Sequence, residues 1–462
     1  MRTSSPQALL CVLYGAAFLA GFNENLVNMA LASVMAEFGI SSVTAQWLVT
    51  GYMIVATVVV ACMAFLYRRF SLRALFFGAS TASLAGAIMG LCAPDFAWLL
   101  AARLVQALGT GVFIPLMMNT VLAVAPARRL GTYLAIGSGV ITFGPAFAPV
   151  ICGSLVTTFG WRFVFLPSAA AMGVIAAAGL AFVRGHRAST AEIDLPSTAL
   201  ACAALFCLSF GLAEFGTRPC AAVLSLGIAA ASAAAFIVRQ LRCAHPLIDL
   251  SPARNPRFRP TLLLVTVAMM SMFSLSVLLP LYCEEALGIT AQAAGVAMLA
   301  PVLTNVAVTM AAGRIMDKHG AWPLLPAGFA LTALGYAFAA LAASHLSLPT
   351  MLAAAIVAFA GIGMVFSPSQ TAGLGSLSSE EHPHGVALSS TCVQVAACIG
   401  PSLYIGVMAG IQNAAENAGA ADACASAAGF AAAMGIGAVV ALIGCATAYV
   451  YARRARRASR NV

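Results

Sequence analysis

Residues 64–73, with the sequence AFLYRRFSLR, join two long apolar segments through one short basic loop. The same arrangement recurs along the chain, because all but three of its 23 Lys and Arg residues lie in alternate gaps between apolar segments or near the two ends. The exceptions are Arg103, Arg162 and Arg218. Basic loops of membrane proteins are retained on the cytoplasmic side. The pattern therefore predicts a multi-pass membrane protein with both termini in the cytoplasm.

The composition of the chain excludes a soluble globular protein. Hydrophobic residues make up 62% of the 462 residues and charged residues only 8%, whereas a soluble domain carries about 25% charged residues. The net charge is +9, but the basic residues are spread over short loops rather than gathered in one patch, so we expect no nucleic-acid partner. We expect the chain to lie in the lipid bilayer of a plasma membrane, which in a bacterium is the inner membrane.

Fourteen segments are long and apolar enough to cross about 30 Å of hydrocarbon as helices. An all-α fold follows, because a helix satisfies all of its backbone hydrogen bonds within one segment. The segments cover approximately residues 9–31, 46–66, 74–91, 96–124, 133–156, 163–183, 196–215, 221–238, 261–282, 294–312, 324–343, 350–369, 386–408 and 425–449.

The two halves of the chain repeat each other at a constant offset. Residues 38–41 (FGIS) precede the second segment, and residues 287–290 (LGIT) precede the tenth, 249 positions later. The loop at 64–71 aligns with the loop at 313–320 at the same offset. This duplication predicts two bundles of six helices related by an axis along the membrane normal, which is a common plan of transporters.

The boundaries of the two bundles follow from the repeat. Gly144-Pro145 in the fifth segment recurs as Gly400-Pro401 in the thirteenth. We therefore predict an N-terminal bundle at residues 1–190 and a C-terminal bundle with a basic tail at 246–462. The seventh and eighth segments then form an inserted pair with a linker at 191–245.

Three sequence motifs resemble a known family. Residues 313–320 (GRIMDKHG) resemble the G-x-x-x-D-[RK]-x-G loop of the major facilitator superfamily. Residues 103–111 (RLVQALGTG) are similar to the R-x-x-Q-G-x-G element of that superfamily, with Ala107 in place of a glycine. Residues 137–153 look like its antiporter motif G-x-x-x-x-x-x-G-P-x-x-[GA]-P-x-x-x-G.

The resemblance covers nearly the whole chain and is strongest to the fourteen-span drug:proton antiporter family, to which residues 46–52 and 160–163 are also similar. It implies a major-facilitator fold and a proton-coupled exporter of lipophilic drugs or other small molecules. We expect no cofactor and no enzymatic activity.

Two groups of residues are candidates for gating and close helix packing. In the first half, Arg68 occupies the position that matches the acid of the signature loop, so any gating role of this loop falls on the second copy. In the fifth segment, small residues and prolines permit close approach and bending of helices, which suits both tight packing and a pliant seal against proton leakage. The candidates are Gly144, Pro145, Pro149, Gly313, Asp317 and Gly320.

Glu24 is the one acid among 14 that lies well inside an apolar segment, with Glu214 near the end of another. The family reads L-D-x-T-I-V-N in the first segment, and this chain has its acid one position later, about 100° around a helix. A carboxyl group in hydrocarbon faces a partner or a wet cavity and is protonated more readily than in water. Glu24 and Arg103 lie at similar depths in their segments, about 10 Å from the outer ends. We predict that Glu24 carries the proton and Arg103 tunes its affinity; the alternative is a static ion pair.

Five further residues are candidates for substrate binding. Asn25 and Asn28 form a polar stripe with the acid at helical spacing, and hydrogen bonding between helices is the alternative role. Met269, Met272 and Phe273 resemble an adaptable lining for varied ligands, with a lipid-facing or core position as the alternative.

The expected function is export by a monomer that exchanges protons for a small-molecule substrate while two six-helix halves rock between inward and outward openings. The nearest alternative is a dedicated exporter of one endogenous product, such as a siderophore or an antibiotic. A membrane enzyme is disfavoured because His, Asp and Glu residues do not cluster at one membrane face. A non-transporting sensor is disfavoured because no loop is long enough to form a soluble domain.

Overall fold

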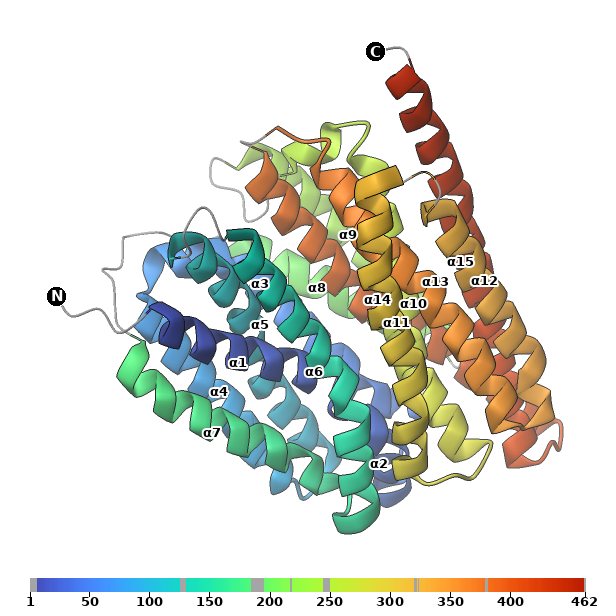
Figure 1. The fold of residues 1–462 in the computed structure, drawn as a ribbon. Coiled ribbons are helices and arrows are strands. Elements are labelled where there is room, and N and C mark those ends of the chain that lie inside the picture. The colour runs from blue at the N-terminus through green and yellow to red at the C-terminus, as the bar shows by residue number, and fades with distance from the viewer. Residues whose placement is uncertain are drawn as a thin grey trace. The chain divides into compact units, whose positions relative to one another are not determined.

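The computed structural model describes residues 6–124, 130–183, 195–216, 218–243, 250–319, 322, 324–378 and 381–460. Over these residues the regular secondary structure is entirely helical (Figure 1). The α-helices are α1 (Pro6–Asn25), α2 (Leu31–Phe38), α3 (Ser42–Arg69), α4 (Leu72–Leu91), α5 (Phe96–Val124), α6 (Leu130–Phe159), α7 (Phe165–Phe182), α8 (Leu195–Ala213), α9 (Pro219–Arg242), α10 (Arg259–Glu285), α11 (Ala291–His319), α12 (Leu324–Ala342), α13 (Leu348–Leu374), α14 (His382–Asn417) and α15 (Asp422–Arg460). The short 3₁₀ helices are η1 (Asn28–Ala30), η3 (Trp161–Val164), η4 (Ser251–Arg254) and η5 (Ala343–His345).

Among the described residues, 13 helical segments are long and apolar enough to cross a membrane, and a shorter apolar segment, Phe143–Phe159, lies within α6. Each of the fourteen predicted segments coincides with one of these helices, when α1 and α2 are taken together as the first. The prediction of an all-α, multi-pass membrane protein is confirmed.

The first segment is interrupted rather than continuous. α1 ends at Asn25, a turn follows, and the chain resumes as η1 at Asn28 and as α2, which extends to Phe38. The Asn28 Nδ2 group donates a hydrogen bond of 2.9 Å to Asn25 Oδ1. Asparagine side chains compete with the backbone for hydrogen bonds and favour helix ends. The prediction of an unbroken helix over residues 9–31 is therefore wrong. Asn25 and Asn28, which were expected to form a polar stripe along one helix, lie on the two sides of a helix break.

The chain divides into two compact units, Met1–Cys202 and Ala203–Val462, and α8 begins in the first and ends in the second. In the first unit, α5 packs against α1, α3 and α4, and α7 packs against α1 and α4. In the second unit, α13 packs against α10, α11 and α12, and α15 packs against α10 and α12. The two sets of contacts correspond helix by helix. The repeat seen in the sequence therefore extends to the way the helices pack.

Corresponding glycines bring two helix pairs into backbone contact. A Cβ atom on Gly144 of α6 would lie 2.5 Å from the carbonyl oxygen of Phe18 in α1. A Cβ atom on Gly400 of α14 would lie 3.0 Å from the carbonyl oxygen of Met270 in α10. Both glycines precede a proline inside a helix, as the repeated Gly-Pro pair requires. In each unit the close approach of this helix pair therefore depends on the absence of a side chain.

Gly144→Ala is expected to destabilise the protein by about 1–3 kcal/mol, because the added methyl group would overlap the backbone of α1. Gly173→Ala on α7 is the matched control, since a Cβ atom there would meet nothing within 4 Å. Thermal unfolding of both variants in detergent measures the difference. Equal unfolding temperatures for Gly144→Ala and the control would contradict the close approach of α6 to α1.

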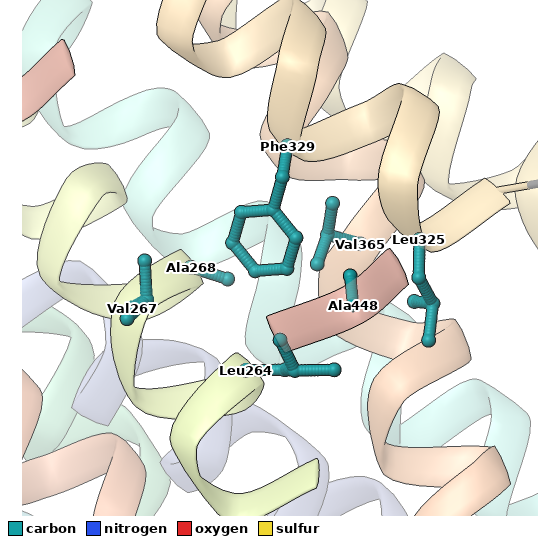
Figure 2. Close-up of a cluster of buried hydrophobic side chains, with 7 residues drawn as sticks. All are labelled: Leu264, Val267, Ala268, Leu325, Phe329, Val365 and Ala448. Carbon is teal, nitrogen blue, oxygen red and sulfur yellow. The ribbon is translucent and has the colours of Figure 1, made fainter. Parts of the chain in front are cut away.

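The core of the second unit is apolar and joins four of its helices. Figure 2 shows the ring of Phe329 among aliphatic side chains from α10, α12, α13 and α15. Without a hydrophobic driving force between helices in lipid, such van der Waals packing holds a helical bundle together. The cluster consists of Leu264, Val267, Ala268, Leu325, Phe329, Val365 and Ala448.

Candidate functional site

Arg103 of α5 is 0% exposed and lies in the interior of the first unit. Its Nε group donates to the carbonyl oxygen of Leu48 in α3 at 3.2 Å. Its Nη1 group donates to Gln106 Oε1 at 2.6 Å, and its Nη2 group donates to the carbonyl oxygen of Asn23 in α1 at 3.1 Å. The guanidinium carbon lies 4.0 Å from the centre of the Tyr52 ring. One buried cation therefore connects the three helices α1, α3 and α5 through hydrogen bonds.

The neighbours of Arg103 extend this network to α7. Gln106 Nε2 donates to Ser168 Oγ at 3.1 Å, and Tyr52 Oη donates to Thr110 Oγ1 at 2.6 Å. All of these side chains are buried. A buried charge is very costly unless hydrogen bonds compensate it, so this network is what allows an arginine to remain inside a membrane helix. We call Arg103, Gln106, Tyr52, Thr110 and Ser168 the Arg103 cluster.

Glu24 lies beside the Arg103 cluster. It is half-buried in the last turn of α1, and it follows Asn23, whose carbonyl oxygen binds Arg103. Glu24 interacts electrostatically with both Arg103 and Tyr52. The first membrane segment, including the break after Asn25, extends to Phe38 rather than to the predicted end at residue 31. Glu24 therefore lies nearer the middle of this segment than predicted. The structure thus brings the two predicted proton-coupling residues into one region.

Asn23 is a site residue that the sequence did not single out. Its side chain is 0% exposed, and neither amide atom has a hydrogen-bond partner among the described residues. A buried polar group without a partner costs about 1–3 kcal/mol, and in native proteins such groups often have a functional role or bind water. Unused hydrogen-bonding capacity therefore lies next to Glu24 and Arg103. The signal available in the sequence was the polar run at 23–25 inside an apolar segment.

The candidate substrate-binding residues lie in both units. Asn25 and Asn28 are buried at the break after α1 and are bonded to each other. Met269, Met272 and Phe273 lie on α10 of the second unit, where Met269 is buried and the other two are half-buried. The first pair is therefore near Glu24, and the second group belongs to the helix that corresponds to α1 in the repeat.

The signature motif at 313–320 begins within a helix rather than in a loop. α11 continues through Gly313 and Asp317 to His319, and Gly320 lies outside the described residues. A Cβ atom on Gly313 would meet nothing within 4 Å. The helix is longer than the apolar segment at 294–312 that predicted it, because hydropathy does not register a helix that extends beyond the hydrocarbon.

Comparison with known proteins decides the family. The sequence profile described as Major Facilitator Superfamily matches residues 13–401 and 261–462. The chain belongs to the Major Facilitator Superfamily. The family predicted from the motifs is confirmed, and the two packed units with corresponding helices are the bundles of a major-facilitator protein.

Relatives in this superfamily include named resistance proteins. The lincomycin resistance protein LmrB of Listeria monocytogenes is 31% identical over 413 residues, which cover 88% of this chain and 88% of that protein. The multidrug resistance protein B homolog of Mycobacterium tuberculosis is 29% identical, over 86% of this chain and 74% of that protein. The crystal structure of peptide transporter POT in complex with sulfate has a TM-score of 0.70 at 16% identity, covering 96% and 95% of the two chains. This last similarity confirms the major-facilitator fold.

Proposed function

We propose that this protein is a proton-coupled exporter of lipophilic drugs or similar small molecules. The observation that carries the proposal is the end-to-end similarity to a lincomycin resistance protein. The coupling part is supported by the site, because a half-buried carboxyl group lies beside a fully buried arginine within apolar helices. In such surroundings a carboxyl group gains and loses a proton as its partner and its access to water change.

In this mechanism the two bundles rock as a monomer in the plasma membrane and open alternately to each side. Glu24 takes a proton from outside as the substrate is released, and Arg103 sets its proton affinity. The helix break after Asn25 gives this region of α1 a place to bend. Substrate contacts are assigned to Asn25, Asn28, Met269, Met272 and Phe273, and gating and packing to Gly144, Pro145, Pro149, Gly313, Asp317 and Gly320.

A transport assay in inverted vesicles tests the proposal. Vesicles that contain the protein are expected to accumulate compounds from a lipophilic drug panel that includes lincomycin, and to lose this activity when an uncoupler collapses the proton gradient. Vesicles without the protein are the control. Accumulation that persists without the gradient would contradict proton coupling. Uptake of a single compound from a broad panel would favour the dedicated-exporter alternative.

A separate prediction concerns the side of the membrane on which the loops around α8 and α9 lie. With both termini in the cytoplasm, α8 and α9 form an inserted pair that crosses the membrane twice. Reporter fusions at Arg187 and Arg254 are then expected to report the cytoplasm, and a fusion at Arg218 the outside. Opposite sides for Arg187 and Arg254 would require an odd number of crossings between them, and would contradict the fourteen-span arrangement.

A further inference from the structure

Five exposed arginines lie at one end of the second unit, where α10 begins and α15 approaches its C-terminus. No ion pair with an acidic residue involves any of them in the part of the chain that the structure describes. Uncompensated guanidinium groups at one end of a bundle form a surface that attracts anions. We call Arg254, Arg257, Arg259, Arg453 and Arg454 the arginine surface.

The two segments that carry these arginines meet at the C-terminal end of α13. Tyr451 Oη donates to the carbonyl oxygen of Ala372 at 3.5 Å. Asn255 Nδ2 donates to the carbonyl oxygen of Ser376, four residues further on, at 3.0 Å. Arg257 interacts electrostatically with Tyr451, which connects the two segments directly. The arginine surface is therefore a single patch rather than two separate basic loops.

An aromatic pair marks the level of this patch in the membrane. The rings of Trp322 and Tyr449 lie 5.9 Å apart, and such residues gather at the boundary between hydrocarbon and headgroups. Ala452 is still buried, at 1% exposure, and Arg453 follows it. Arg453 lies four residues beyond Tyr449, about 6 Å along the helix. The headgroup layer is about 5–8 Å thick on each side, so the arginine surface lies at the level of lipid phosphates.

Helix α15 continues beyond the arginine surface. The helix continues to Arg460, and its red end projects past the neighbouring helices of its unit (Figure 1). Residues 453–460 (RRARRASR) contain five arginines and no acid. A chain segment so rich in arginine at this level is suited to lie near an anionic membrane surface.

We propose that the arginine surface binds the phosphate headgroups of anionic phospholipids. Arginine presents a planar fork of donors that engages phosphate oxygens in pairs, and it is weakly hydrated for a cation. The lipid is therefore held by direct hydrogen bonds as well as by the surface potential. Bound lipid neutralises the charge of this surface and holds the start of α10 and the end of α15 at the same leaflet.

Lipid retention measured by native mass spectrometry tests the proposal. The protein is reconstituted in equal amounts of phosphatidylglycerol and phosphatidylcholine, extracted, and washed in detergent. Wild type is expected to retain phosphatidylglycerol preferentially. In the variant R257Q/R453Q/R454Q, the ratio of retained phosphatidylglycerol to retained phosphatidylcholine is expected to fall tenfold or more. In the variant with Gln at positions 453, 454, 456, 457 and 460, this ratio is expected to fall at least as much.

The matched control is R68Q/R69Q/R73Q, which removes the same charge from a basic loop of the first unit and is expected to retain wild-type preference. Unchanged retention in both test variants would overturn the proposal, and an equal loss in the control would reduce it to nonspecific attraction by positive charge. Displacement of the lipid by millimolar inorganic phosphate would overturn the assignment to a lipid. Size-exclusion profiles identify any variant that misfolds, and the two test variants share only Arg453 and Arg454.

Discussion

Glu24→Gln is expected to abolish export driven by the proton gradient and to leave the protein folded and able to bind substrate. The substitution preserves the shape of the side chain and resembles its protonated form, but it removes the ionisation step. Glu24 lies half-buried beside Arg103 at the break in the first membrane segment. The proposed mechanism assigns the change of charge in the transport cycle to this carboxyl group. Initial rates in inverted vesicles are expected to fall to the level of vesicles without the protein, while equilibrium binding of the substrate changes little.

Glu214→Gln is the matched control. Glu214 follows the last residue of α8 and lies 3.8 Å from the exposed Arg218, so its carboxylate is partnered near a helix end rather than in the interior of a bundle. We expect this variant to export at the wild-type rate. Full proton-driven export by a stably expressed Glu24→Gln protein would contradict the mechanism and direct attention to Glu214 or to a proton carried by the substrate itself.

Much of the fold follows from physical constraints that act on the sequence directly. The hydrocarbon of the membrane requires long apolar helices, and the surface charge of the membrane retains arginine-rich loops on the cytoplasmic side. The apolar segments and the arginine-rich loops together therefore identify each membrane helix. The break after Asn25 does not follow from such counting. Leu26, Val27, Met29 and Ala30 are as apolar as their neighbours, and hydropathy is the same for a helix and for a turn buried by surrounding helices.

Most hydrogen-bond partners of Arg103 could not be predicted from the sequence either. Two of its three hydrogen-bond acceptors are backbone carbonyl oxygens, at Asn23 and Leu48, and every residue type supplies a carbonyl. No side-chain pattern could therefore identify these partners. Only Gln106, which stands three residues from Arg103 and so faces the same side of the helix, was recognisable from the spacing. The sequence located the buried charge, but the way it is compensated depends on how α1 and α3 pack against α5.

Arg103→Ala is expected to lower both stability and export severely. The substitution leaves Gln106 Oε1 without its donor, removes a hydrogen bond from two backbone carbonyls, and opens a void over the Tyr52 ring in a fully buried site. Each buried acceptor without a partner costs about 1–3 kcal/mol, so the unfolding temperature in detergent should fall clearly. Arg103→Lys retains the charge, but an ammonium group cannot reach three acceptors in a fixed fork. We expect this variant to fold and to export slowly.

The comparison of the two Arg103 variants separates packing from coupling. Arg73→Ala is the control for loss of a positive charge, because Arg73 is exposed at the start of α4 and its removal is expected to change stability by less than about 0.5 kcal/mol. If Arg103→Lys unfolds at the wild-type temperature but exports slowly, the geometry of the guanidinium group serves transport and not only folding. If Arg103→Ala is as stable as wild type and exports at full rate, the cluster is incidental to both. The proton would then have to move without the buried cation that lies beside Glu24.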